Sequence, residues 1–248
     1  MVTDIFIKSY RKDFPWLKNC LRSITERCRG FRKTILVVPN QDLDELKTWG
    51  LTQETVIGVD EPSGRGYDIQ QCIKLEADKY SDADYITFFD SDLYATKELR
   101  PEMLFSNNKP IIYITALSSL NGEDRKIDAV PWRPVMEHVM KQKIQYEYMR
   151  RHPMTYPVWI LKSFRDYVQR EFKFNIWEYF VGGKCPHPLS EFNVIGAFAW
   201  VFYKNRFVFV NTEKGIMPEP FVVQFWSHGG PGHPFNAPLL LKYGLTIT

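Results

Sequence analysis

The sequence predicts an α/β fold: a single domain with a mostly parallel central sheet flanked by helices, and a mixed carboxyl-terminal half. Short runs of apolar, β-branched and aromatic residues alternate with helical patterns as far as residue 89. Such alternating units form parallel sheets, because each helix returns the chain to the same sheet edge. The 248 residues are 44% hydrophobic and 25% charged, which is ordinary for a soluble globular protein.

The amino-terminal half is predicted to alternate strands with helices. The first helix begins at about Pro15, a residue type favoured in a first helical turn, and apolar side chains recur after it at helical spacing. The loops that follow the strands are expected to gather at one edge of the sheet. The expected strands are 2–7, 34–38, 56–59 and 86–89, the later helices are 42–49 and 67–80, and the converging loops are 8–13, 39–41, 60–66 and 90–94.

The carboxyl-terminal half mixes helices and strands. The sequence contains no internal repeat or low-complexity linker, so residues 1–248 are predicted to form one domain. The expected elements are a strand at 111–117, a break at 131–134, a helix at 135–150 that Pro153 stops, a helix at 158–172, a loop at 181–188, an apolar segment at 194–203 that 190–193 opens, short strands at 207–210 and 221–226, and a Gly/Pro-rich loop at 227–234.

Composition argues against several classes of protein. Lys and Arg (32) exceed Asp and Glu (29) by only three charges, which is too few to indicate nucleic-acid binding. The cysteines show neither CxxC pairing nor zinc spacing, so free thiols in a reducing compartment are expected at Cys20, Cys28, Cys72 and Cys185. The amino terminus has no signal-peptide hydrophobic region, and no apolar run reaches the length of a membrane span. A soluble, cytoplasmic protein is therefore expected.

Most of the functional signal lies in residues 84–92, where a buried strand stops at two carboxylates, Asp90 and Asp92. These side chains would leave the carboxyl edge of the sheet, where open α/β sheets bind ligands. Neighbouring carboxylates repel each other unless a cation lies between them, and Mg²⁺ or Mn²⁺ that also touches substrate phosphates is the natural partner. The alternative is a plain turn and helix N-cap, where Asp and Ser are also favoured, but the position after a buried strand favours the metal site.

Two neighbouring loops have residues suited to an anion or a base. Gly64-Arg65-Gly66 precedes a helix, where backbone amides and a fork-shaped Arg donor favour phosphate, although the loop lacks the P-loop signature. After the first strand, Tyr10 can stack on a base, and Lys8 or Arg11 can meet phosphate. The alternatives are a plain turn for the first loop and a solvated basic loop for the second.

Glu191 opens the apolar segment at 194–203. A partly buried Glu beside a cleft makes a good general base, and the alternative role is a charge that complements a helix N-terminus. In the terminal loop, a neutral His228 can complete the coordination of a cation, with His233 as a weaker candidate; either can instead be an ordinary surface residue. The remaining candidates, His138 and His152, are interpreted as structural.

A strand that ends in Phe88-Phe89-Asp90-Ser91-Asp92 behind three β-α units resembles the GT-A fold glycosyltransferases, a Rossmann-like class with a DXD motif. The compact size is similar to that of glycosyltransferases encoded by large algal viruses. The resemblance covers roughly residues 1 to 230, and it implies a nucleotide-sugar-binding half at 1–117 and an acceptor-side half at 118–248. The terminal loop lacks the full His signature of the retaining families, and no Gln-x-Asp-Trp block is present.

The resemblance implies roles for individual residues. In the family, the DXD aspartates hold Mn²⁺ or Mg²⁺ on the diphosphate of the donor, the loop after the first strand holds the base, and a downstream carboxylate activates the acceptor. These roles fall on Glu191 and Asp92 as catalytic residues, on Asp90, Asp92 and His228 as metal ligands, and on Lys8, Ser9, Tyr10, Arg11, Asp60, Arg65, Asp90 and Ser91 as nucleotide-sugar-binding residues.

The expected function is a metal-dependent glycosyltransferase that moves a sugar from a nucleotide diphosphate sugar, expected to be a UDP-sugar, to a hydroxyl of a glycan or glycoprotein. For a viral protein the expected location is the host cytoplasm. One alternative is a sugar nucleotidyltransferase, although the loop after the first strand lacks the glycines of that class. The other is a non-catalytic carbohydrate-binding protein with the same fold.

Overall fold

The computed structural model describes residues 1–120, 132–214 and 217–247 and confirms the α/β fold. Its central sheet has the strand order β3-β2-β1-β4-β9. The first four of these strands are parallel, and β9 runs antiparallel to β4. The strands are β1 (Thr3–Lys8), β2 (Thr34–Pro39), β3 (Glu54–Val59), β4 (Tyr85–Asp90) and β9 (Met154–Pro157).

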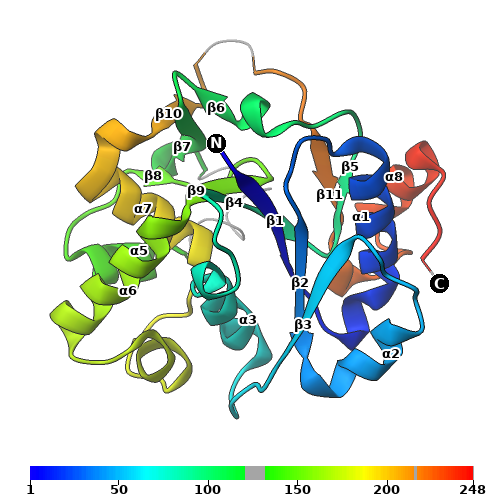
Figure 1. Cartoon of the computed structure of the whole chain (residues 1–248). Coiled ribbons are helices and arrows are strands. Elements are labelled where there is room, and N and C mark those ends of the chain that lie inside the picture. Colours follow the sequence, from blue (N-terminus) through cyan, green and yellow to red (C-terminus); the bar gives the residue numbers. More distant parts are fainter. Residues whose placement is uncertain (121–131, 215–216, 248) are drawn as a thin grey trace.

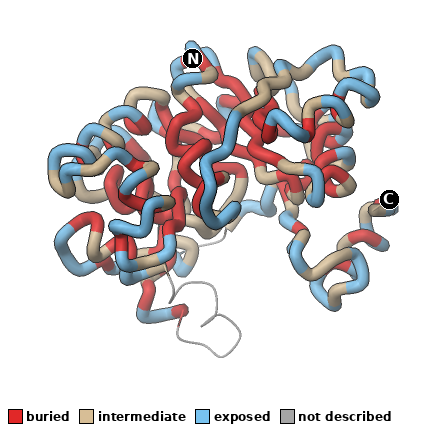
Figure 2. The backbone as a smooth tube through the Cα atoms, turned by 90° about the horizontal axis from the view of Figure 1, so that it is seen from below, coloured by how far each residue is buried: buried red, intermediate tan, exposed pale blue. Residues whose placement is uncertain are grey.

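Helices cover both faces of this sheet and enclose two apolar cores (Figure 1). Alternation along the strands divides the side chains, so that Phe6 packs in the core on the α3 side and Ile5 and Ile7 pack in the core on the α1 side. Burial is concentrated along the central strands and the inner sides of the helices (Figure 2). One layer contains α1 (Phe14–Arg27) and α2 (Leu43–Lys47), and the other contains α3 (Gly66–Lys74), α5 (Arg133–Met140), α6 (Val158–Phe172) and α7 (Glu191–Tyr203).

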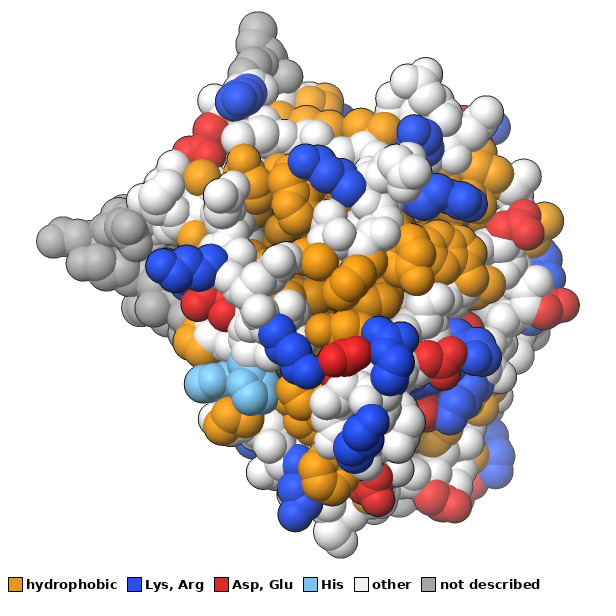
Figure 3. Space-filling view, turned by 90° about the vertical axis from the view of Figure 1, so that its left-hand side faces the viewer, with side chains coloured by type: hydrophobic (Ala, Val, Ile, Leu, Met, Phe, Trp, Pro, Cys, Tyr) orange, Lys and Arg blue, Asp and Glu red, His pale blue; other side chains and the backbone are white. Residues whose placement is uncertain are grey.

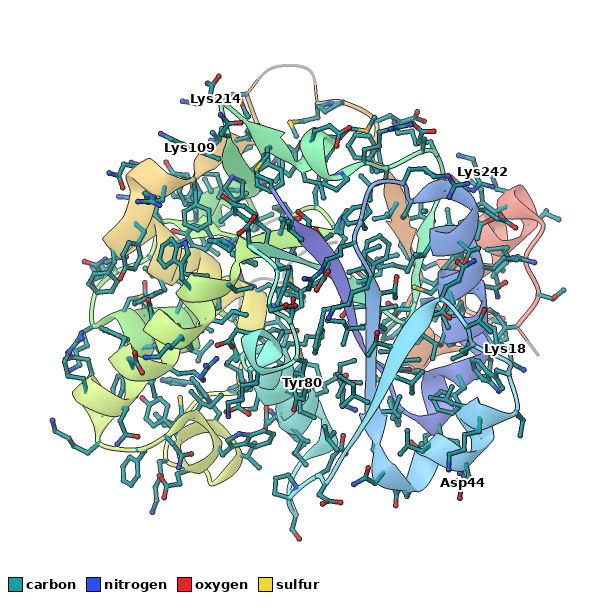
Figure 4. All side chains as sticks on the ribbon, viewed as in Figure 1. Lys18, Asp44, Tyr80, Lys109, Lys214 and Lys242 are labelled. Carbon is teal, nitrogen blue, oxygen red and sulfur yellow. The ribbon has the colours of Figure 1, made fainter. Side chains whose placement is uncertain are left out.

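Labelled and exposed side chains show what lies on the outside of the two layers. Figure 4 shows Lys18 of α1 and Asp44 of α2 at the periphery, whereas Tyr80 lies beside α3 with its ring 6.0 Å from that of Phe6. On the opposite side, the face formed by the layer of α5, α6 and α7 carries hydrophobic side chains between charged ones (Figure 3), and Phe202 of α7 is 48% exposed. No helix among residues 1–120, 132–214 and 217–247 is long and apolar enough to cross a bilayer.

The remaining strands form two small sheets beside the central one. In the first, β7 (Lys109–Ala116) runs parallel to β10 (Val208–Asn211) and antiparallel to β6 (Phe105–Ser106) and β8 (Tyr146–Glu147). In the second, β5 (Leu93–Ala95) runs antiparallel to β11 (Val222–Gln224), which places the chain that leaves β4 beside the carboxyl-terminal segment. The helix α8 (Asn236–Tyr243) lies near α1 (Figure 1).

Short helical turns connect many of these elements. Several of them sit directly after strands, where the chain turns away from the sheet edge. The 3-10 turns are η1 (Arg11–Asp13), η2 (Asn40–Asp42), η3 (Ala77–Lys79), η4 (Pro101–Leu104), η5 (Leu117–Leu120), η8 (Lys204–Arg206) and η9 (Ser227–Gly229), and η7 (Trp177–Val181) is a π-helical turn.

The helix predicted at 135–150 is confirmed only in its first part, as α5, and is wrong beyond it. It ends at Met140, because Lys141 adopts a left-handed backbone conformation with φ 54° and the chain then enters β8. The prediction failed because Ile144 and Tyr148 are buried, as a helical stripe would require, although they belong to segments without regular secondary structure. The helix predicted at 67–80 also divides, into α3 and η3. In the predicted break, Arg133 and Pro134 open α5, and Pro131 lies outside the described residues.

Candidate functional site

The site is built at the carboxyl edge of the central sheet, between β1 and β4. Asp90 is the last residue of β4 and is paired in register with Lys8, the last residue of β1. Strand alternation places Asp90 on the same face as Phe88, which packs in the core beneath α3 and α7. The carboxylate of Asp90 therefore emerges where the ends of α3 and α7 meet the sheet edge.

Lys74 of α3 holds two carboxylates at this position. Its Nζ lies 2.5 Å from Oδ1 of Asp90 and 2.7 Å from Oε1 of Glu191, the first residue of α7. The side chains of Lys74 and Glu191 are 6% and 8% exposed, and that of Asp90 is 23% exposed. A buried ammonium shared by two carboxylates joins the end of β4 to the start of α7 through charge-assisted hydrogen bonds.

The face of α3 that points to the site is a polar stripe of Tyr67, Gln71 and Lys74. These residues recur at helical spacing, four and then three residues apart. Oε1 of Gln71 accepts a hydrogen bond from the backbone amide of Glu191 at 2.9 Å. Helix α3 therefore contacts the start of α7 twice, through Gln71 and through the ammonium of Lys74.

Burial and charge set the protonation of this group. Burial alone would raise the pKa of Asp90, but the Lys74 ammonium outweighs it, and the pKa of Asp90 lies below its ordinary value. The pKa of Glu191 is raised because burial outweighs the attraction of Lys74, and the charge of Asp90 adds to the effect. Burial lowers the pKa of Lys74, but its two carboxylate partners outweigh this and hold the ammonium charged.

Asp92 lies in the turn between β4 and β5 and is half-buried. Its carboxylate accepts long hydrogen bonds from the backbone amide of Ser227 (3.3 Å) and from Nε2 of Gln224 (3.4 Å). Burial, and then the neighbouring charge of Asp90, raise the pKa of Asp92 to about 7. A carboxylate with weak donors and a like-charged neighbour is one whose ionised form a bound cation would stabilise.

Asp13 and His228 approach the same place from η1 and η9. Burial raises the pKa of Asp13, and the nearby His228 imidazole opposes this by favouring the carboxylate. The hydroxyl of Ser91, which is buried, donates a hydrogen bond to Oδ2 of Asp13 at 3.4 Å. Asp92 and His228 therefore share a neighbourhood that also contains Asp13, an acidic residue that the sequence patterns did not single out.

The donor set fits a divalent ion that a substrate helps to bind. Within residues 1–120, 132–214 and 217–247, no three His, Cys, Asp or Glu side chains are arranged to hold a metal without further ligands. Mg²⁺ and Mn²⁺ sites in phosphate-handling proteins commonly take one or two carboxylates and fill the remaining positions with phosphate oxygens and water. Asp90 and Asp92 would hold the ion, with His228 close to Asp92 through the amide of Ser227.

Lys8, Ser9 and Tyr10 line the edge beside Asp90. The Nζ of Lys8, buried, lies 2.8 Å from Oε1 of Glu61 and 2.8 Å from the carbonyl oxygen of Ser9. Among the described residues, the buried hydroxyl of Ser9 has no hydrogen-bond partner, and Tyr10 follows at the start of η1. The loops after β1 and β3 are thus joined by the Lys8–Glu61 ion pair at the expected edge.

Three residues predicted to bind the nucleotide sugar are held by other partners. The exposed guanidinium of Arg11 pairs with Glu45 at 3.1 Å and with Asp42 at 3.5 Å. Asp60 accepts a hydrogen bond from Nδ2 of Asn40 at 2.6 Å. Arg65 makes two hydrogen bonds to Asp68, at 2.7 and 2.8 Å, within its own helical turn, with its guanidinium over the ring of Tyr67.

The structure also brings His152 to the site, although its sequence context suggested a structural role. The antiparallel register of β4 and β9 pairs Phe88 with Met154, and continuing it places His152 opposite Asp90. Burial lowers the pKa of His152, and the charge of Asp90 opposes the shift. In contrast, His233 packs its ring edgewise against Trp226 at 4.5 Å, and its Nδ1 accepts the amide of Phe235, so it stabilises the terminal loop.

Besides His152, the sequence patterns missed Lys74 and Asp13. A basic residue on the inward face of a short amphipathic helix, seven positions after Tyr67, was a usable signal for Lys74. The signal for Asp13 was weaker, because an acidic residue before a helix that begins with Phe14-Pro15 is usually a charge that complements the helix N-terminus.

Fold and site together define an α/β protein whose carboxyl sheet edge carries an acidic pair, a buried lysine and a buried glutamate. Residues 17–121 match the model of a family described as a family of unknown function (DUF6492). That match contains Arg65, Lys74, Asp90 and Asp92 and stops before α7. No curated protein matches the chain.

Proposed function

We propose that this protein is a metal-dependent glycosyltransferase that uses a nucleotide diphosphate sugar, most simply a UDP-sugar, and an acceptor hydroxyl on a glycan or glycoprotein. The observation that carries the proposal is the pair Asp90 and Asp92 at the carboxyl end of β4, beside the buried Lys74–Glu191 contact. Ligands of open α/β sheets bind at this edge, and the acidic pair suits a cation that also touches a diphosphate.

The residues divide between two sides of the site. Asp90 and Asp92 would hold Mn²⁺ or Mg²⁺ with help from His228, and the ion would neutralise negative charge on the leaving diphosphate. On the donor side, Lys8 ends β1, and Ser9 and Tyr10 follow it. They are suited to the base and the phosphates, and the buried hydroxyl of Ser9, which has no partner among the described residues, is a candidate donor. The contacts of Arg11, Asp60 and Arg65 make them secondary candidates for this role.

Glu191 is the proposed general base on the acceptor side. Its raised pKa increases the proton affinity of the carboxylate, which favours removal of a proton from an acceptor hydroxyl. Lys74 contacts Oε1 of this carboxylate, so Oε2 is the oxygen that would take the proton. Attack by a hydroxyl that Glu191 activates would invert the anomeric configuration of the sugar.

Hydrolysis and transfer assays with a panel of nucleotide sugars test the proposal. The wild-type protein should release UDP from one donor in the presence of Mn²⁺, and Asp92→Ala should abolish this release. Asp44→Asn, on the exposed side of α2, is the matched carboxylate control and should retain full turnover. Undiminished turnover in Asp92→Ala, or no turnover of any donor by the wild-type protein, would reject the function.

A further inference from the structure

We propose that Lys74 is a built-in competitor of the divalent ion at Asp90, and that this competition makes metal and nucleotide binding mutually dependent. The inference rests on the proposed function and concerns Lys74 as a positioning residue. Its starting point is the 2.5 Å contact between Nζ of Lys74 and Oδ1 of Asp90, which places a full positive charge on a predicted metal ligand.

Lys74 cannot easily leave this position in the ligand-free protein. Its side chain is 6% exposed, its second partner Glu191 is buried, and its ammonium lies 4.8 Å from the ring of Phe192. An ammonium that loses one carboxylate in such surroundings loses charge compensation that solvent does not replace. A divalent ion that arrives alone must therefore displace the ammonium or bind beside it, against Coulomb repulsion.

A diphosphate removes this obstacle. Its oxygens add negative charge at the sheet edge, so an ammonium displaced from Asp90 gains a new partner while it keeps Glu191. Metal and diphosphate then each strengthen the binding of the other, and by thermodynamic reciprocity the two coupling factors are equal. The same shared cation links the donor side at Asp90 to the proposed base at Glu191.

Lys8 provides a matched comparison. Its ammonium is also buried at this edge, and Lys8 is paired in register with Asp90, but its contacts go to Glu61 and the carbonyl of Ser9. Lys8→Met therefore removes an equal charge from the same edge without removing a contact to a metal ligand. If the affinity for Mn²⁺ rises more in Lys74→Met than in Lys8→Met, Lys74 competes directly with the ion at Asp90. An equal rise in both variants would reflect only the overall positive charge at this edge.

Electron paramagnetic resonance of Mn²⁺, titrated into the full chain with and without UDP, is the test. Lys74→Met should bind Mn²⁺ alone at least about tenfold more tightly than wild type, since a unit charge in contact with the ligand is removed. The factor by which UDP tightens Mn²⁺ binding should be smaller in Lys74→Met than in wild type. In Lys8→Met, the affinity for Mn²⁺ alone should change by less than about threefold, because its charge is not on a metal ligand.

The double variant Lys74→Met/Glu191→Gln removes both partners of the buried ion pair and serves if Lys74→Met does not fold. Equal Mn²⁺ affinity in wild type and the Lys74 variants, or equal gains in Lys74→Met and Lys8→Met, would overturn the competition while leaving the proposed function standing. Failure of the wild-type protein to bind Mn²⁺ even with UDP would overturn the proposed function and the competition together.

Discussion

Replacing Asp92 with Asn should stabilise the metal-free protein at pH 8, although it removes a predicted metal ligand. Asp92 has a pKa of about 7 in the folded protein, against an ordinary value of 3.8, because it is partly removed from solvent and lies near the charge of Asp90. The folded protein therefore holds this proton to a higher pH than the unfolded chain does. Stability falls as pH rises from about 4 to 7, and the loss persists above pH 7.

The magnitude follows from the difference between the two pKa values. At about 1.36 kcal/mol for each pH unit, the difference between 7 and 3.8 gives a ceiling of about 4 kcal/mol. Asp92 is half-buried, so solvent screening reduces the effect. Asn also loses part of the hydrogen bonding to Ser227 and Gln224, which costs about 1 kcal/mol. A net gain of about 1–2 kcal/mol in the free energy of unfolding at pH 8 is expected.

Urea unfolding followed by circular dichroism, with a chelator present, measures this gain at pH 5 and pH 8. The stabilisation of Asp92→Asn relative to wild type should be larger at pH 8 than at pH 5. Asp44→Asn is the control, because the exposed Asp44 is ionised at both pH values and its effect should not depend on pH. The reasoning is refuted if Asp92→Asn is less stable than wild type at pH 8, or if its gain is the same at both pH values.

Three further predictions follow from named contacts. Glu191→Gln should lower the transfer rate at least about a hundredfold while UDP affinity stays within about threefold of wild type, as expected for loss of a general base. An unchanged rate in a transfer assay would show that Glu191 is not the base. Arg11→Ala should leave UDP affinity measured by calorimetry nearly unchanged, because Asp42 and Glu45 already hold the guanidinium; a large loss would mean that Arg11 moves to the ligand. Gly196→Ala should destabilise the protein by about 1–3 kcal/mol in urea unfolding, because the new Cβ would lie 2.3 Å from Cβ of Tyr148, whereas Gly66→Ala meets no neighbour within 4 Å and should be nearly neutral.

The amino-terminal fold could be predicted because its signals are local and repeated. Each strand from β1 to β4 is a short apolar run bounded by polar residues, and this pattern placed the ends of these strands to within about two residues. The strand β9 was missed because Met154–Pro157 is short and ends in proline, so only its pairing with β4 makes it a strand. The helix predicted at 135–150 was too long, because buried residues beyond Met140 follow helical spacing although they are not in a helix.

The site shows the same division between local and long-range information. The acidic pair at Asp90 and Asp92 was visible because two carboxylates directly follow a buried strand. The ion pair of Lys74 with Glu191 joins residues that lie 117 positions apart in the chain, and no local sequence pattern predicts it. His152 likewise gains meaning only from the register of β9 beside β4.

Isothermal titration calorimetry with UDP, in the presence and absence of Mn²⁺, reports directly whether the acidic pair and a diphosphate share a metal ion. Mn²⁺ should tighten UDP binding by at least about tenfold, and Asp92→Asn should abolish this enhancement, since the phosphates and the acidic pair would share the ion. UDP binding that Mn²⁺ leaves unchanged, or no UDP binding at all, would contradict a diphosphate–metal site at Asp90 and Asp92.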